Sequence, residues 1–149
     1  MWRFTIDFLR EERGLGQLLF AFSPDGGDVR SEADYLFRYP GDDYVDVFGV
    51  DYYFVAGAER LARLAELTVK QAAHHGKIAA ITEFGARGGL NAAGVDGARW
   101  LEQSFLTPLS KSPTALGIAY ALAWRNARVD HCFLPYPGHR GQASLARVC

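Results

Sequence analysis

Four strand-sized apolar runs alternate with helical segments along this chain, and this alternation restricts the possible fold more than any other feature. We expect strands over residues 17–22, 45–51, 77–82 and 117–123. Near-continuous apolar strands that alternate with helices are typical of a parallel sheet with both faces covered. The sequence therefore predicts an α/β fold.

The segments outside these strands show helical periodicity. Apolar residues at helical spacing predict helices over residues 2–10, 58–75 and 96–109, the first of them ahead of the first strand. Gly76 is the expected end of the second helix. The segment between the first two strands is short and polar, so any helix there is brief.

The number of strands indicates how much of a larger architecture is present. A complete (β/α)8 barrel needs about 250 residues and eight strands. This chain has 149 residues and four predicted strands, so residues 1–149 fit one domain that is half of a barrel. Such a half exposes strand edges and apolar faces, and we expect self-association or dependence on a missing half.

Charge and spacing exclude several kinds of partner. The 16 basic and 17 acidic residues leave a net charge of −1 without a basic stripe, so neither nucleic acid nor a membrane surface is expected as a partner. The apolar runs are too short for a transmembrane helix.

His131 and His139 have no standard zinc spacing, and we predict neither metal nor cofactor. Cys132 and Cys149 could pair, but the second ends the chain, so two free thiols are expected.

Glu83 follows the third predicted strand, at the end where parallel α/β folds collect their reactive groups. A lone carboxylate at such a position is costly unless it is hydrogen-bonded or takes part in chemistry. One interpretation is a glutamate that caps the loop. The other is a nucleophile for glycosyl transfer, held on a rigid strand end.

Aromatic side chains follow two other predicted strands. Trp124 and Arg125 come after the fourth strand, where an indole can stack on a sugar ring and a guanidinium can bind hydroxyls, although Trp124 could also be core. Tyr53 could donate a hydrogen bond that orients Glu83. Simple packing is the alternative for Tyr53 or its neighbour Tyr52.

Several segments of the chain resemble glycoside hydrolase family 26, which consists mainly of endo-β-1,4-mannanases. Residues 39–53, with the sequence YPGDDYVDVFGVDYY, resemble the sixth strand of that family. Residues 18–25 resemble its fifth strand, residues 80–85 its seventh and residues 120–127 its eighth, and residues 133–139 resemble the segment that follows. The resemblance covers essentially the whole chain and implies a partial TIM barrel with roughly strands 5 to 8.

The same resemblance implies roles for four residues. Glu83 would be the catalytic nucleophile and Tyr53 the tyrosine that hydrogen-bonds it. Trp124 would lie under the sugar at the cleavage point, and Arg125 would reach the next sugar. The family hydrolyses internal β-1,4-mannosidic bonds with retention, through a covalent intermediate. A β-glucan or xylan substrate, and a non-catalytic half-barrel that binds glycan or assembles with another half, stay open as alternatives.

One part of the family pattern has no counterpart in this sequence. The family's acid/base glutamate follows a histidine on the fourth strand, just before a helix that residues 2–10 resemble. Glu11, Glu12 and Glu102 are expected on helices, away from the strand ends. We therefore expect this chain to lack the general acid. Its absence should lower the reaction rate by about 10²- to 10⁴-fold, so the chain should be nearly inactive alone. Family members are usually exported, so a secreted or periplasmic full-length enzyme is expected, although this chain shows no signal.

Overall fold

The computed structural model describes residues 1–128 and 130–139, and in this part of the chain five strands form one parallel sheet. The strands are β1 (Ala21–Phe22), β2 (Val47–Phe48), β3 (Asp51–Phe54), β4 (Ile78–Ala86) and β5 (Tyr120–Ala123). β2 and β3 are consecutive pieces of one extended segment, and both pair with β4. The α/β fold with four parallel extended segments is confirmed.

Strand boundaries differ from the prediction at two places. β1 is shorter than predicted, because the Asp46 carboxylate, instead of a backbone carbonyl, accepts the hydrogen bond from the Phe20 N–H at 2.8 Å. β4 extends to Ala86 because β3 pairs with it as far as that residue. Glu83 therefore lies inside a strand, and the expectation that it follows the strand end was wrong.

Close to Glu83, the pairing leaves one extra residue on β4 relative to the strands on both sides. Val47 pairs with Ile78 whereas Asp51 pairs with Glu83, so the β4 side is one residue longer between these pairs. The pairing with β5 shifts in the same region, between Ile81 and Phe84. Such bulges bend a strand and redirect a side chain, and they are frequent next to active sites.

The helices cover most of the segments predicted for them. They are α1 (Trp2–Asp7), η1 (Phe8–Glu12), α2 (Glu32–Tyr35), η2 (Asp42–Tyr44), α3 (Ala58–His74), η3 (Leu101–Leu106), α4 (Thr107–Ser110) and η4 (Ala115–Gly117). The brief helix expected between the first two strands is α2. α3 ends just before Gly76, whose φ of +66° is a backbone conformation that favours glycine. Within the described residues, no helix is both long and apolar enough to cross a membrane.

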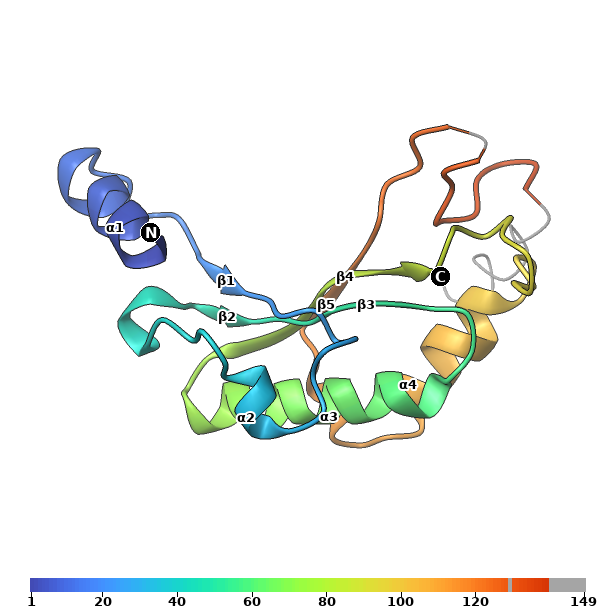
Figure 1. Cartoon of the computed structure of the whole chain (residues 1–149), viewed down its shortest axis with the longest axis horizontal. Coiled ribbons are helices and arrows are strands. Elements are labelled where there is room, and N and C mark those ends of the chain that lie inside the picture. The colour runs from blue at the N-terminus through green and yellow to red at the C-terminus, as the bar shows by residue number, and fades with distance from the viewer. Residues whose placement is uncertain (129, 140–149) are drawn as a thin grey trace.

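The helices α2, α3 and α4 lie on one face of the sheet, and the other face is open (Figure 1). The core lies between α3 and the strands, where Leu61 and Leu64 of the helix are buried with Phe48 and Ile81 of the sheet. The prediction that both faces are covered was wrong. In a closed barrel the inner face of each strand is covered by other strands, and the described residues form only part of that ring.

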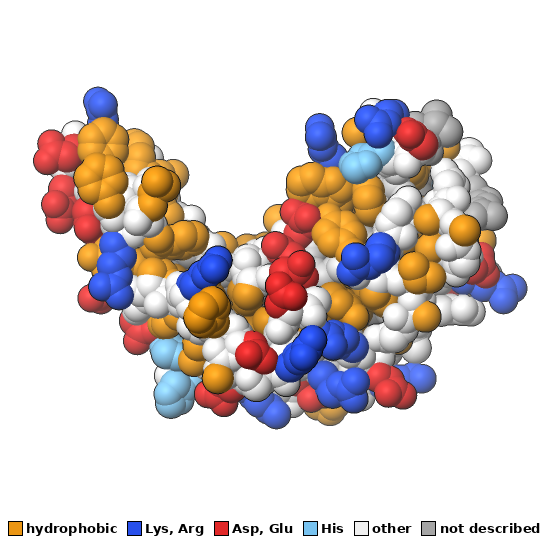
Figure 2. Space-filling view, in the orientation of Figure 1, with side chains coloured by type: hydrophobic (Ala, Val, Ile, Leu, Met, Phe, Trp, Pro, Cys, Tyr) orange, Lys and Arg blue, Asp and Glu red, His pale blue; other side chains and the backbone are white. Residues whose placement is uncertain are grey.

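Both edges of the sheet carry exposed apolar side chains. Leu19, just ahead of β1, is 70% exposed, and Leu122 on β5 is 56% exposed. Figure 2 shows the molecule hollowed between its two ends, with apolar side chains along the hollow. Uncovered edges and apolar side chains are what a partial barrel presents to solvent.

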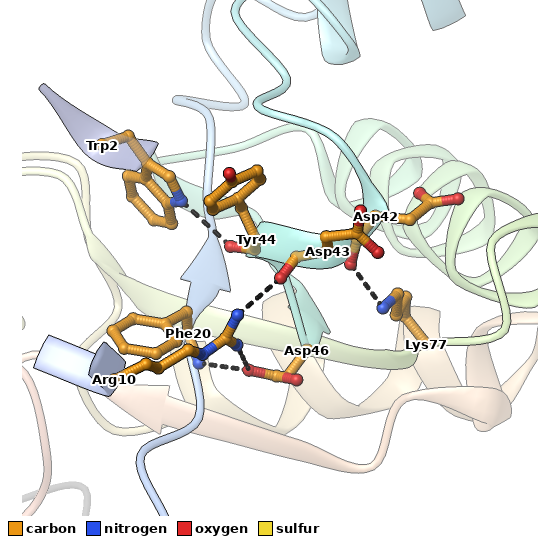
Figure 3. A network of polar contacts seen from close by, with 8 residues as sticks. All are labelled: Trp2, Arg10, Phe20, Asp42, Asp43, Tyr44, Asp46 and Lys77. Atoms are coloured by element: carbon orange, nitrogen blue, oxygen red, sulfur yellow. Dashed lines mark hydrogen bonds and ion pairs between the residues drawn. The ribbon is translucent and has the colours of Figure 1, made fainter. Parts of the chain in front are cut away.

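Polar contacts hold the N-terminal helix to the segment ahead of β2 (Figure 3). The Trp2 indole N–H donates to the Tyr44 carbonyl at 3.0 Å, and the Arg10 guanidinium donates to the Asp43 carbonyl at 2.7 Å. Arg10 also lies 3.9 Å from the Asp46 carboxylate. Little apolar burial supports this helix, because Phe4 on α1 is 73% exposed. Its apolar surface is available for a further layer of protein.

Candidate active site

The centre of the candidate site is a carboxylate and a phenol on neighbouring strands. Tyr53 on β3 donates a hydrogen bond from its hydroxyl to Glu83 Oε1 on β4, over 2.6 Å. Asp51 pairs with Glu83, and Tyr53 is two residues further along β3, so all three side chains project from the same face of the sheet. The contact predicted between Tyr53 and Glu83 is present.

Tyr53 is a permanent donor in this pair. Burial raises the pKa of the Tyr53 hydroxyl far above its ordinary value, and the hydrogen bond to the Glu83 carboxylate raises it further. The phenol therefore keeps its proton throughout the physiological range. It holds one carboxylate oxygen of Glu83, Oε1, in a fixed position.

Gly85 provides the space in which the Tyr53 ring lies. A Cβ at Gly85 would stand 2.5 Å from Phe133 Cδ1 and 2.9 Å from Tyr53 Cε1, so no larger residue fits without displacement. The rings of Tyr53 and Phe133 meet edge to face, with 5.7 Å between centroids. Phe133, from the segment after β5, therefore packs Tyr53 into the position from which it reaches Glu83.

Asp51 is a second carboxylate at the site, to which sequence reasoning assigned no role. Its Oδ1 accepts hydrogen bonds from the Ser23 hydroxyl at 2.7 Å and from the Thr82 hydroxyl at 3.0 Å, and these two hydroxyls also contact each other. Ser23, which directly follows β1, is thus part of this cluster. The signal that could have identified Asp51 is a carboxylate at the end of an apolar strand, as for Glu83.

Burial dominates the electrostatics of Asp51. Desolvation raises the pKa of the Asp51 carboxyl above its ordinary value, and the hydrogen bonds from Ser23 and Thr82 offset this only in part. The negative charges of Glu83 and Asp25 act in the same direction as burial. The two strands therefore hold a pair of carboxylates that differ in their hydrogen-bond partners, a phenol for one and two hydroxyls for the other.

Trp124 and Arg125 lie directly after β5. The Trp124 backbone N–H donates to the carbonyl of Phe84, the residue after Glu83, at 2.9 Å. The Trp124 indole N–H donates to His131 Nε2 at 3.2 Å, and the Arg125 guanidinium lies 5.9 Å from the centroid of the indole ring. The tryptophan is thus tied to the strand that carries Glu83, and its ring is held by a histidine that the sequence did not predict.

The other predictions about side chains concern groups away from this centre. Glu11 and Glu12 lie on η1 and Glu102 on η3, as expected. No group of three His, Cys, Asp or Glu residues in the described chain could hold a metal ion. Cys132 is a buried free thiol. The expectation of two free thiols also concerns Cys149, which lies outside the described residues.

Glu83, Tyr53 and Trp124 thus lie toward the carboxyl end of a parallel sheet, the end at which barrel proteins collect their reactive groups. Residues 1–107 match the model of glycosyl hydrolase family 26. The chain belongs to this family, which confirms the resemblance seen in its sequence.

Individual relatives agree with the family model. A mannan endo-1,4-beta-mannosidase from Bifidobacterium adolescentis is 32% identical, over 85% of this chain and 14% of that protein. An endo-beta-1,4-mannanase double mutant from Cellulomonas fimi superposes with a TM-score of 0.88 at 34% identity, over 98% of this chain and 33% of that one. A family 26 beta-mannanase from Bacteroides ovatus gives a TM-score of 0.83 at 30% identity, over 98% of this chain and 40% of that one. The chain therefore spans less than half of the relatives that it matches, and its fold is a partial TIM barrel.

Proposed function

We propose that Glu83 is the nucleophile of a retaining glycoside hydrolase that cleaves internal β-1,4-mannosidic bonds. The observation that supports this role is the 2.6 Å hydrogen bond from Tyr53, which holds the carboxylate on a rigid strand. The free oxygen of Glu83 would attack the anomeric carbon as the bond to the leaving oxygen breaks, forming a glycosyl ester. Water would then displace the ester, so that two inversions give net retention.

The reaction also needs a carboxylic acid that protonates the leaving oxygen, about 5 to 5.5 Å from the nucleophile in retaining enzymes. We propose that this acid lies outside residues 1–149. Asp51 is the carboxylate paired with Glu83 on the neighbouring strand, but its Oδ1 already accepts hydrogen bonds from Ser23 and Thr82. Glu102 lies on η3 and Glu11 on η1, away from the strand pair.

The substrate proposed is β-mannan, because the relatives named above are mannanases. Turnover by the full-length enzyme should be compared on mannan, β-glucan and xylan, with hydrolysis fastest on mannan. Faster hydrolysis of β-glucan or xylan would transfer the proposal to that polymer without changing the role of Glu83.

The role of Glu83 can be tested by chemical rescue. Glu83→Ala should abolish turnover, and azide should restore reaction of an activated mannoside by attacking from the side that Glu83 occupied, giving an α-mannosyl azide. A β-mannosyl azide would instead assign Glu83 as the acid/base and overturn the proposal. The 149-residue chain alone should release no measurable sugar from mannan, and substantial turnover would indicate that Asp51 supplies the proton.

A second function, assembly with another half-barrel, is favoured by the exposed apolar residues at both sheet edges. Leu19 and Leu122 lie at opposite edges and are largely exposed, which is unfavourable for a monomer in water. We propose that the isolated 149-residue chain self-associates unless another half covers these edges. A monodisperse monomer in light scattering would contradict this proposal.

A further inference from the structure

The hydrogen bond between Trp124 and His131 exists in only one protonation state of the histidine. An indole N–H can donate but not accept, so His131 Nε2, 3.2 Å away, must be the acceptor. An imidazole nitrogen accepts only when it carries no proton. The contact therefore requires a neutral imidazole that carries its one ring proton on Nδ1.

A tight turn holds His131 beside the indole. The Ala127 N–H donates to the His131 carbonyl, and the His131 N–H donates to the Arg128 carbonyl, each over 2.9 Å. The histidine ring also meets the Phe133 ring edge to face at 4.9 Å. Phe133 in turn packs on Tyr53. His131 is thus fixed by its own backbone and lies next to the aromatic ring that supports the Tyr53–Glu83 pair.

Several charged or polar side chains lie in the segment around His131 and beyond Phe133. Arg125 lies over the Trp124 ring, and Arg128 forms an ion pair with Asp130 at 2.7 Å within the same turn. Beyond Phe133 are the Tyr53 hydroxyl, which stays protonated, and the Glu83 carboxylate. Histidine is the residue type among these whose side chain gains a charge when it binds a proton at its ring nitrogen.

We propose that His131 is a positioning residue for Trp124: its neutral imidazole fixes the rotation of the indole, and protonation of the imidazole releases it. The consequence for catalysis rests on the proposed function, in which Trp124 lies under a sugar of the substrate. The loss of one such hydrogen bond should lower kcat/KM by about 2- to 10-fold. Because protonation removes the acceptor, this loss should occur on the acid side of the imidazole titration.

Two substitutions separate the acceptor from the titration. His131→Gln keeps an acceptor oxygen that does not titrate, and His131→Leu removes the acceptor at a similar volume. The indole N–H resonance of Trp124, assigned with Trp124→Phe in the ¹⁵N-labelled full-length enzyme, reports the hydrogen bond directly. In the wild type it should shift in a single transition as the imidazole gains a proton. In His131→Gln it should not shift, and in His131→Leu it should stay at the acid-form position.

Activity provides the second readout. The wild-type kcat/KM on mannan should fall relative to that of His131→Gln as the pH drops through the same transition. His131→Leu should show the loss at neutral pH, and His131→Gln should recover most of it. A wild-type resonance without the transition, or one unchanged in His131→Leu, would overturn the proposal. If the resonance behaves as expected but Trp124→Ala leaves kcat/KM unchanged, the sugar-binding role of Trp124 fails and the hydrogen bond stands.

Discussion

Tyr53 and Glu83 lie on adjacent parallel strands, and the phenol donates to the carboxylate across the gap between those strands at 2.6 Å. The relationship depends on three local features: the pairing of Asp51 with Glu83, the extra residue of β4, and the absence of a side chain at Gly85.

Removal of the phenol hydroxyl should impair catalysis more than stability. Tyr53→Phe keeps the ring against Phe133 but loses a hydrogen bond to a charged group, so we expect kcat on mannan to fall about 10- to 100-fold. Steady-state kinetics of the full-length enzyme measure this. Tyr52→Phe is the matched control, because the Tyr52 ring is buried and stacks on Phe54. Equal effects of the two substitutions would argue against a special role for Tyr53.

Gly85 should not tolerate a methyl group. Its Cβ would stand 2.5 Å from Phe133 and 2.9 Å from Tyr53, and overpacking of this kind costs about 1 to 3 kcal/mol. Denaturant unfolding of Gly85→Ala should show this loss of stability. Gly16→Ala is the control, because a Cβ at Gly16 has no atom within 4 Å and the substitution should be nearly neutral. Stability equal to wild type in Gly85→Ala would mean that Phe133 does not pack against Gly85 and Tyr53.

Asp51 should make stability depend on pH. Its folded-state pKa is raised, so folding favours the protonated form, and the charged form is penalised at neutral pH. The stability of wild type relative to Asp51→Asn should therefore increase as the pH falls from 7 toward the ordinary value of about 4. Urea unfolding of both proteins across this range measures the difference. Parallel profiles would contradict the burial of a charged carboxylate at this position.

Charge at the sheet edges should reduce self-association of the 149-residue chain. Leu19→Lys and Leu122→Lys place an ammonium group at each open edge, where natural edge strands often carry lysine. Light scattering should show a smaller average mass for the double variant. Leu116→Lys is the control, because Leu116 is also exposed, at 64%, but lies on η4 and not at a strand edge. The same decrease in the control would point to net charge as the cause.

Much of the fold could be predicted from the apolar runs, because the buried strands of a parallel sheet consist of nearly uninterrupted apolar residues. Helix α3 was predictable from its buried stripe and from Gly76. The strand position of Glu83 was not, because it depends on the partner strand β3, which pairs with β4 through Ala86. Local composition around Gly85 instead indicated a loop.

The candidate site likewise contains residues that could be predicted from the sequence and residues that could not. Glu83, Tyr53 and Trp124 could be predicted because each comes at or near the end of an apolar segment. The cluster joins Asp51 of β3 and Thr82 of β4 to Ser23, which follows β1. The contact of Trp124 with His131 depends on how the chain turns after β5. Contacts between residues that are far apart in the sequence, or that depend on how a loop is folded, leave no periodic pattern in the sequence.

The central claim is that Glu83 forms the covalent bond to the sugar, and trapping this bond tests it most directly. A 2-deoxy-2-fluoro-mannoside with an activated leaving group needs little help from an acid, so it should label the nucleophile and react no further. Mass spectrometry of the digested full-length enzyme should find one sugar, on the peptide that contains Glu83, and none in Glu83→Gln. A label on Asp51 or on any other residue would contradict the account.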